Sequence, residues 1–280
     1  MIVNDLKRWR FWRRFFTNAF AAIGVMSALA GILSLFVGTL TDRLSWLIWV
    51  VVAIAIAFGG VRAWPRPIEV SFSSPNTKIR VVRGDLFQQQ THLVIGTCDT
   101  FDTRSPQIAP NSVQGAYLTR QYRGDADSLD AALAVHLSTL PIAGTVVKSG
   151  KTNRYDVGTV VPLQALGARH FFVAYTSMNE DNKAHGTADG LWKSLGSLWA
   201  SVRRHSNGEP LSIPVLGGGQ SGLSPVLPAE DAIRFIALSF IVAARQNGVC
   251  SELRIVALPE LYDRLNHFEL QAFLSGLARN

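Results

Sequence analysis

The sequence predicts an α/β domain built on a largely parallel sheet, preceded by a two-helix hairpin that crosses a membrane. From residue 67 onward, short apolar segments alternate with longer amphipathic segments, which is typical of a sheet covered by helices. The residues before this point contain two uncharged apolar stretches instead. We therefore expect two domains, residues 1–66 and residues 67–280.

The two apolar stretches have nearly the length of membrane spans. Residues 19–37 and 44–61 contain no charged side chain, and each approaches the roughly 20 apolar residues that cross a bilayer. We expect transmembrane helices at about residues 17–38 and 44–62. The alternatives are a cleaved signal peptide for the first stretch and buried core helices for both.

Basic residues flank both stretches. Lys7, Arg8, Arg10, Arg13 and Arg14 precede the first, and Arg62 and Arg66 follow the second. Because the cytoplasmic flanks of transmembrane helices are rich in Lys and Arg, both termini are predicted to be cytoplasmic.

The net charge of +7 belongs mainly to the N-terminal part. Residues 1–66 hold eight Lys or Arg and two Asp or Glu, whereas residues 67–280 hold nineteen and eighteen. The larger part therefore lacks the excess of basic residues that nucleic-acid binding requires, and we expect no nucleic-acid partner.

The chain has two cysteines, Cys98 and Cys250. Both are predicted to lie in the cytosol, where structural disulfides are rare. The sequence contains no Cys-x-x-Cys or His-Glu-x-x-His pattern, so we expect no metal site and no cofactor.

The pattern of residues 67–280 predicts seven strands and five helices. Strands are expected at 68–72, 79–82, 93–96, 158–163, 170–175, 211–216 and 253–257, and helices at 112–122, 127–138, 187–205, 228–246 and 261–277. Ligands of such sheets bind at the carboxyl ends of the parallel strands. Three loops follow predicted strands there: RGDLF at 83–87, TCDTFDTR at 97–104, and the end of IPVLGGGQSGL at 213–223.

The third loop has the chemistry of an anion site. Its three consecutive glycines can present backbone N–H groups to a phosphate, while a plain flexible loop is the alternative. No Lys-Ser or Lys-Thr pair follows, which excludes a P-loop. Ser112 can cap the helix that begins beside it, and the N–H groups of that helix would offer a second anion site. For Asp85, Asp99 and Asp102, the alternative to ligand binding is an ordinary role in a turn or a helix cap.

The segment IRVVRGDLFQQQTHLVIGTCDTFDT, together with IPVLGGGQSGL, resembles a macro domain, the module that binds ADP-ribose and its relatives. The resemblance covers residue 68 to the C-terminus and implies a three-layer αβα sandwich with a mixed, largely parallel sheet. Many macro domains carry Asn-Ala-Ala-Asn where this chain has Thr-Cys-Asp-Thr at residues 97–100. This departure favours ligand binding over ADP-ribosyl hydrolysis, so we expect no enzymatic activity and no catalytic residue.

Two apolar stretches before a domain with this CDTFDT loop resemble one branch of the family, the membrane-anchored macro-domain effectors of type II Thoeris antiphage defence systems. The resemblance implies that a TIR-domain partner consumes NAD and makes a signal nucleotide, histidine-ADP-ribose. It also implies self-association and disruption of the bacterial inner membrane, in which the chain would be a multi-pass protein. The alternatives are a membrane-tethered ADP-ribosyl hydrolase and a scaffold for ADP-ribosylated partners.

The resemblance also assigns the ligand contacts. Asp85 would accept a hydrogen bond from the adenine amino group, with Leu86 and Phe87 beside the base. The distal ribose or its conjugated group would lie against Thr97, Asp99, Thr100 and Asp102. The diphosphate would lie between two backbone segments, one formed by Ser112, Val113, Gln114 and Gly115 and the other by Gly217, Gly218, Gly219, Gln220, Ser221 and Gly222.

Overall fold

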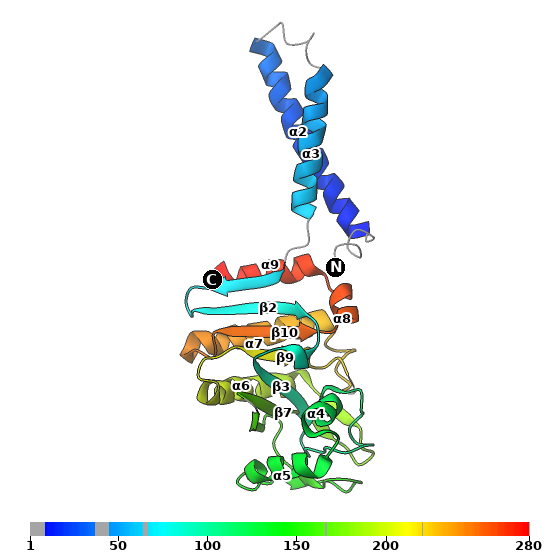
Figure 1. Ribbon diagram of the computed structural model, residues 1–280, viewed down its shortest axis with the longest axis vertical. Helices are drawn as coiled ribbons and strands as arrows, with labels where there is room; N and C mark the ends of the chain where they lie inside the picture. Colours follow the sequence, from blue (N-terminus) through cyan, green and yellow to red (C-terminus); the bar gives the residue numbers. More distant parts are fainter. Residues whose placement is uncertain (1–8, 37–44, 64–66, 166, 220, 280) are drawn as a thin grey trace. The chain divides into compact units, whose positions relative to one another are not determined.

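The computed structural model describes residues 9–36, 45–63, 67–165, 167–219 and 221–279 (Figure 1). Contacts between residues divide the chain into two compact units, Met1–Arg66 and Pro67–Asn280.

The first unit contains helices α2 (Trp9–Phe36) and α3 (Ser45–Ala63), which pack against each other. Small residues allow the close approach: Ala19 and Ala55 are buried, and a Cβ on Gly59 would lie 3.1 Å from the carbonyl oxygen of Phe15. Helix α2 begins eight residues earlier than predicted, at Trp9. Arginine is a good helix former, so the basic segment before residue 17 continues the helix.

Large apolar side chains lie on the outer faces of α2 and α3. Phe20, Leu29 and Trp49 are each more than half exposed. In the part of the chain that the structure describes, no helix has both the length and the apolar character that crossing a membrane requires. The predicted segments 17–38 and 44–62 are thus largely helical, but their assignment as a transmembrane hairpin is unsupported. Residues 37, 38 and 44 of that prediction lie outside the described residues.

The second unit is built on an eight-stranded sheet, counted within the described residues. Its order is β1-β2-β10-β9-β3-β7-β6, with β8 paired to β7. The five central strands are parallel, whereas β1, β6 and β8 pair antiparallel. The strands are β1 (Ile68–Phe72), β2 (Thr77–Arg83), β3 (His92–Cys98), β6 (Val160–Ala165), β7 (Ala168–Met178), β8 (Ala184–Gly186), β9 (Leu211–Pro214) and β10 (Glu252–Ala257).

Helices cover both faces of this sheet (Figure 1). Helices α6 (Ala188–His205) and α7 (Ala229–Asn247) pack on one face, and α9 (His267–Arg279) packs beside α7 on β1. Helices α4 (Val113–Tyr122) and α5 (Ala126–Leu137) pack on the other face. Strand β3 shows why both layers are needed: Val94 points into the first core, whereas Leu93 and Ile95 point into the second. The predicted α/β sandwich with a mixed, largely parallel sheet is therefore confirmed.

Several short elements escaped prediction. A two-stranded sheet joins β4 (Gly144–Thr145) and β5 (Asn153–Arg154), and a single 3₁₀ turn, η2, spans Leu86–Gln88. The predicted helix at 261–277 is two helices, α8 (Pro259–Arg264) and α9. Leu265 is extended between them, and the Glu230 carboxylate accepts a hydrogen bond from the Asn266 N–H at 2.6 Å. This bond to a side chain of α7 satisfies a backbone donor in the segment between α8 and α9.

Candidate ligand-binding cleft

A cleft of about 350 Å³ lies where the parallel strands end. Its walls come from the carboxyl ends of β3, β7, β9 and β10 and from the N-terminus of α4. Parallel strands have their carboxyl ends at one edge of the sheet, which is where open α/β sheets bind ligands. The volume falls within the range of about 300–1,000 Å³ that is usual for small-molecule sites.

The structure brings part of the predicted site together in this cleft. Eight predicted residues line it: Thr97, Ser112, Val113, Gln114, Gly217, Gly218, Gly219 and Ser221. Eight others are not among its lining residues: Asp85, Leu86, Phe87, Asp99, Thr100, Asp102, Gly115 and Gly222. Gln220 lies outside the described residues.

The N-terminus of α4 forms one wall. Ser112 caps the helix, because its hydroxyl oxygen accepts a hydrogen bond from the Gly115 N–H at 3.0 Å. The N–H groups of the first helical turn have no partner within the helix and attract anions. A Cβ on Gly115 would lie only 2.4 Å from the Ala109 carbonyl oxygen, so this glycine lets the chain pass close to the helix. Gly115 therefore shapes the wall without lining the cleft.

The glycine loop, residues 217–222, also contributes to the wall of the cleft, through Gly217, Gly218, Gly219 and Ser221. Gly217 has φ of 93° and Gly222 has φ of 68°, a region that favours glycine. Gly218 and Gly219 are exposed, and a Cβ on Gly219 would meet nothing within 4 Å. The fold itself therefore does not require glycine at Gly219. A side chain there would instead obstruct the approach of a ligand to the backbone N–H groups.

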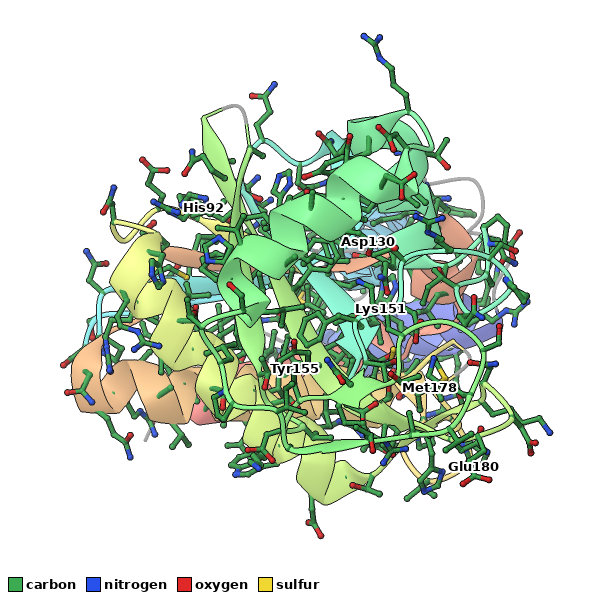
Figure 2. The ribbon with its side chains drawn as sticks, turned by 90° about the horizontal axis from the view of Figure 1, so that it is seen from below. His92, Asp130, Lys151, Tyr155, Met178 and Glu180 are labelled. Atoms are coloured by element: carbon green, nitrogen blue, oxygen red, sulfur yellow. The ribbon has the colours of Figure 1, made fainter. Side chains whose placement is uncertain are left out.

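Asp102, predicted to face the ligand, is the centre of a buried ion cluster. Its carboxylate lies 2.7 Å from Lys148 Nζ, and it accepts hydrogen bonds from the Lys151 N–H at 2.9 Å and the Thr100 hydroxyl at 2.5 Å. Lys151 Nζ also lies 2.5 Å from Asp130 on α5 (Figure 2). The cluster fastens the loop after β3 to the segment between β4 and β5.

Asp99 fixes the end of β7. Its carboxylate accepts a hydrogen bond from the Met178 N–H at 2.8 Å and lies 3.7 Å from Arg154 Nε. Arg154 also donates a hydrogen bond to the Met178 carbonyl oxygen. Burial raises the pKa of Asp99 above its ordinary value. Like Asp102, Asp99 is engaged by groups from the β4–β5 region.

Asp85 is also engaged by protein groups. One carboxylate oxygen accepts a hydrogen bond from the Phe87 N–H at 3.0 Å, and the other lies 2.5 Å from Arg120 Nη1. The Arg120 guanidinium lies 5.0 Å from the centre of the Phe87 ring. Leu86 is buried in the core beneath α4 and α5. The predicted adenine contacts of these residues stay a prediction.

The cleft wall contains residues that sequence reasoning missed, notably Tyr175, Met178 and Leu258. Tyr175 and Met178 belong to β7, whose carboxyl end meets the same edge as the predicted loops. The rule that selected those loops could have selected the end of β7 as well. Leu258 follows β10 and is 64% exposed, which leaves an apolar surface at this end of the cleft.

The described residues that line the cleft include no Lys, Arg, Asp, Glu or His. Cys98 lines it, and burial raises the pKa of its thiol, so that the thiol stays protonated. Polar interactions with a ligand would come from hydroxyls, amides and backbone N–H groups. No cluster of three or more His, Cys, Asp or Glu residues among those described could hold a metal ion.

Solved structures with the same fold define the class of protein. An Oceanobacillus iheyensis macrodomain mutant with ADPR is 15% identical, covers 76% of this chain and 100% of its own, and has a TM-score of 0.51. The Oceanobacillus iheyensis macrodomain with ADP is 14% identical, with coverages of 77% and 99% and a TM-score of 0.50. At this identity the likeness shows the macrodomain fold.

A family model identifies the chain more closely. The model described as "Thoeris protein ThsA, Macro domain" matches residues 79–257, which is more than half of the sequence. The chain therefore belongs to this family, as the resemblance in its sequence had indicated. No curated protein matches the chain at a significant level.

Proposed function

We propose that the chain is an antiphage-defence effector whose macro domain binds a nucleotide derived from ADP-ribose. The cleft geometry carries this proposal: an open glycine loop and the N-terminus of α4 line the same pocket, whose described lining residues carry no charge. Both walls offer backbone N–H groups to a diphosphate. Family membership and the ADPR-bound relative support the same ligand class.

We further propose that the domain binds its ligand without converting it. Hydrolysis needs a group that positions or deprotonates water within hydrogen-bond reach of the ligand. Asp99 and Asp102 are the acidic residues nearest in sequence to the β3 end of the cleft, and both are held in ion pairs by the β4–β5 region. Incubation with ADP-ribosylated protein should therefore yield no released ADP-ribose, and steady turnover would favour the hydrolase alternative.

The signal in this proposal is histidine-ADP-ribose, made by a NAD-consuming TIR-domain partner. Binding then favours self-association and disruption of the bacterial inner membrane. A ligand shifts such an equilibrium only when it binds the associated state more tightly. The membrane step is supported by the uncharged stretches at residues 19–37 and 44–61 and by the exposed apolar side chains of α2 and α3.

Calorimetric titration with ADP-ribose, histidine-ADP-ribose and NAD tests the ligand. Gly218→Val would place a branched side chain on the open wall of the cleft and should abolish binding. Gly144→Val is the control, because a Cβ at Gly144 on β4 meets nothing within 4 Å and this residue does not line the cleft; it should leave binding unchanged. Asp85→Ala tests the predicted adenine contact. Absence of binding to all three nucleotides would overturn the proposal, and co-flotation with anionic vesicles tests the membrane step separately.

A further inference from the structure

Helices α6 and α7 lie side by side on one face of the sheet (Figure 1). Near the N-terminus of α6, Trp192 packs against Phe235 of α7, with ring centres 5.0 Å apart. Two turns further along α6, Trp199 Nε1 donates a hydrogen bond to the Ser239 hydroxyl of α7 at 3.1 Å. The contacts advance toward the C-terminus along both helices, so α6 and α7 are parallel.

The outer surface of this helix pair is apolar at its centre. Trp192 is 41% exposed, Leu238 37% and Val242 40%. Leu238 and Val242 are one turn apart on α7 and therefore share a face. Gly196 of α6 is exposed at a similar level, and a Cβ there would meet nothing within 4 Å. These four residues define the α6–α7 surface, and exposed apolar side chains gathered in this way are typical of an interaction site.

Charges of opposite sign lie at the two ends of the α6–α7 surface. Each helix carries an aspartate two turns before its central residue and an arginine two turns after it, which places all three on one face. The residues are Asp189, Gly196 and Arg203 on α6 and Asp231, Leu238 and Arg245 on α7. Because the helices are parallel, the two aspartates share one end of the surface and the two arginines share the other.

The protein itself leaves these end charges largely uncompensated. At the acidic end, one guanidinium, that of Arg234, lies 2.5 to 3.9 Å from three carboxylates, those of Glu230, Asp231 and Glu269. The stem of Lys193 lies beside Gly158, before β6. At the basic end, Arg245 donates a hydrogen bond to the Leu277 carbonyl oxygen at 2.7 Å, which leaves its charge in place. The surface is therefore negative at one end and positive at the other.

We propose that the α6–α7 surface binds the same surface of a second copy of the chain. A two-fold interface requires a surface that complements itself. With the axis perpendicular to the helices and beside Gly196 and Leu238, the helices of the two copies are antiparallel. Apolar centre then meets apolar centre, and the acidic end of each copy meets the basic end of the other. A parallel arrangement would instead bring like charges together.

The size of the surface predicts a weak dimer. Two helices about 27 Å long and about 10 Å apart present roughly 500 Å², compared with about 800 Å² per partner in a stable interface. This interface does not require the ligand, and it gives the self-association proposed above a contact surface in the second unit. Cross-linking is suited to capture such a dimer.

Oxidative cross-linking of full-length Leu238→Cys, without nucleotide, tests the contact. A residue beside the two-fold axis faces its own counterpart, and Cys98 and Cys250 are buried, so we expect a reducible dimer linked through position 238. Val135→Cys is the matched control, because Val135 is 69% exposed on α5, which packs on the opposite face of the sheet. It should form no dimer. Equal yields from the two variants, or no dimer from Leu238→Cys, would overturn the proposal.

Charge reversal in the Leu238→Cys chain tests the orientation. Asp189→Arg or Arg203→Asp alone would bring like charges together across the interface, so each should slow cross-linking about tenfold. The two reversals combined restore opposite charges on facing α6 helices and should return the rate to within about twofold of the parent. A double variant that cross-links no faster than the single variants would refute the antiparallel interface. Nucleotide binding by the cleft, measured separately, decides the proposed function.

Discussion

Thr97 has a buried hydroxyl without a hydrogen-bond partner among the described residues. An unsatisfied buried hydroxyl costs about 1–3 kcal/mol, and this one lies on the cleft wall, where a ligand can satisfy it. Thr97→Val removes the hydroxyl but keeps the shape of the side chain. We expect a thermal unfolding midpoint that is equal or higher, together with ADP-ribose binding weakened about tenfold, equivalent to about 1.4 kcal/mol.

Thr77→Val provides the opposite pattern as a control. The Thr77 hydroxyl is buried and donates a hydrogen bond to the Cys250 carbonyl oxygen at 2.8 Å. Its loss should destabilise the protein by about 1 kcal/mol and leave nucleotide affinity unchanged. A drop in stability for Thr97→Val with no change in affinity would show that its hydroxyl has a structural partner instead.

The lowered pKa of His170 predicts that the stability of the protein depends on pH. Burial lowers its pKa to about 4, with a smaller contribution from His92, whereas a histidine in the unfolded chain has a pKa of about 6.5. The unfolded chain therefore binds the proton at a higher pH than the folded protein does. The free energy of unfolding should fall as pH drops from about 6.5 to 4, by up to roughly 3 kcal/mol from this residue.

Urea unfolding at several pH values between 4 and 7 measures this dependence. His170→Gln removes the titrating group, so its free energy of unfolding should fall less steeply over the same window. The Tyr117 hydroxyl, which contacts His170 Nδ1, stays protonated throughout because burial raises its pKa. Equal slopes for the two proteins would contradict the assignment of this effect to His170.

At the scale of elements, two helical glycines should respond oppositely to the same substitution. A Cβ on Gly115 of α4 would lie within 2.8 Å of Pro110 atoms, whereas a Cβ on Gly196 of α6 would meet nothing within 4 Å. Gly196→Ala should therefore stabilise the protein by up to about 1 kcal/mol, because alanine is the better helix former. Gly115→Ala should destabilise it by about 1–3 kcal/mol through overpacking.

The same pair separates stability from binding. The segment before α4 must move to accommodate a methyl group at Gly115, and this segment lines the cleft through Ala109 and Asn111. Gly115→Ala should consequently weaken ADP-ribose binding, while Gly196→Ala should leave it unchanged. Chemical unfolding and calorimetry measure the two effects, and a stabilised Gly115→Ala protein would show that the packing at α4 is looser than described.

The strands that line the cleft were predictable because they are continuous apolar segments, as central parallel strands are. The partners of Asp99 and Asp102 were not. Lys148 and Arg154 lie in a region whose strands β4 and β5 have two residues each, too short for any hydrophobic periodicity. Such ion pairs depend on tertiary packing between segments about fifty residues apart, which no local sequence pattern reveals.

The irregular pairing of β7 at Tyr175 was unpredictable for a different reason. It lies in a segment that was correctly predicted as a strand, where side chains normally alternate between the two faces. The register shift beside Cys98 interrupts that alternation, and no local sequence feature marks the shift. By contrast, the glycine loop was recognisable because glycine itself is the signal: a run of residues without Cβ is unfavourable unless backbone geometry or a ligand requires it.

At the scale of the whole molecule, the two units have separate cores. Both hydrophobic clusters of the second unit begin no earlier than Ile68 in the sequence, and the buried residues Ala19 and Ala55 belong to the first unit. The cleft is likewise lined by residues of the second unit alone. Folding and nucleotide recognition should therefore depend on residues 67–280, and association with membranes should involve residues 1–66.

A chain that begins at residue 67 tests this division. We expect it to unfold in one cooperative transition and to bind ADP-ribose within about twofold of the full-length affinity, because no core or cleft residue is removed and additivity holds for separate sites. It should also lose the vesicle association proposed for the full-length chain, since the exposed apolar side chains of α2 and α3 are absent. Calorimetry, thermal unfolding and vesicle flotation measure these three properties. If the shortened chain folded but bound nucleotide much more weakly, residues 1–66 would contribute to recognition, and the ligand would then act on both units at once.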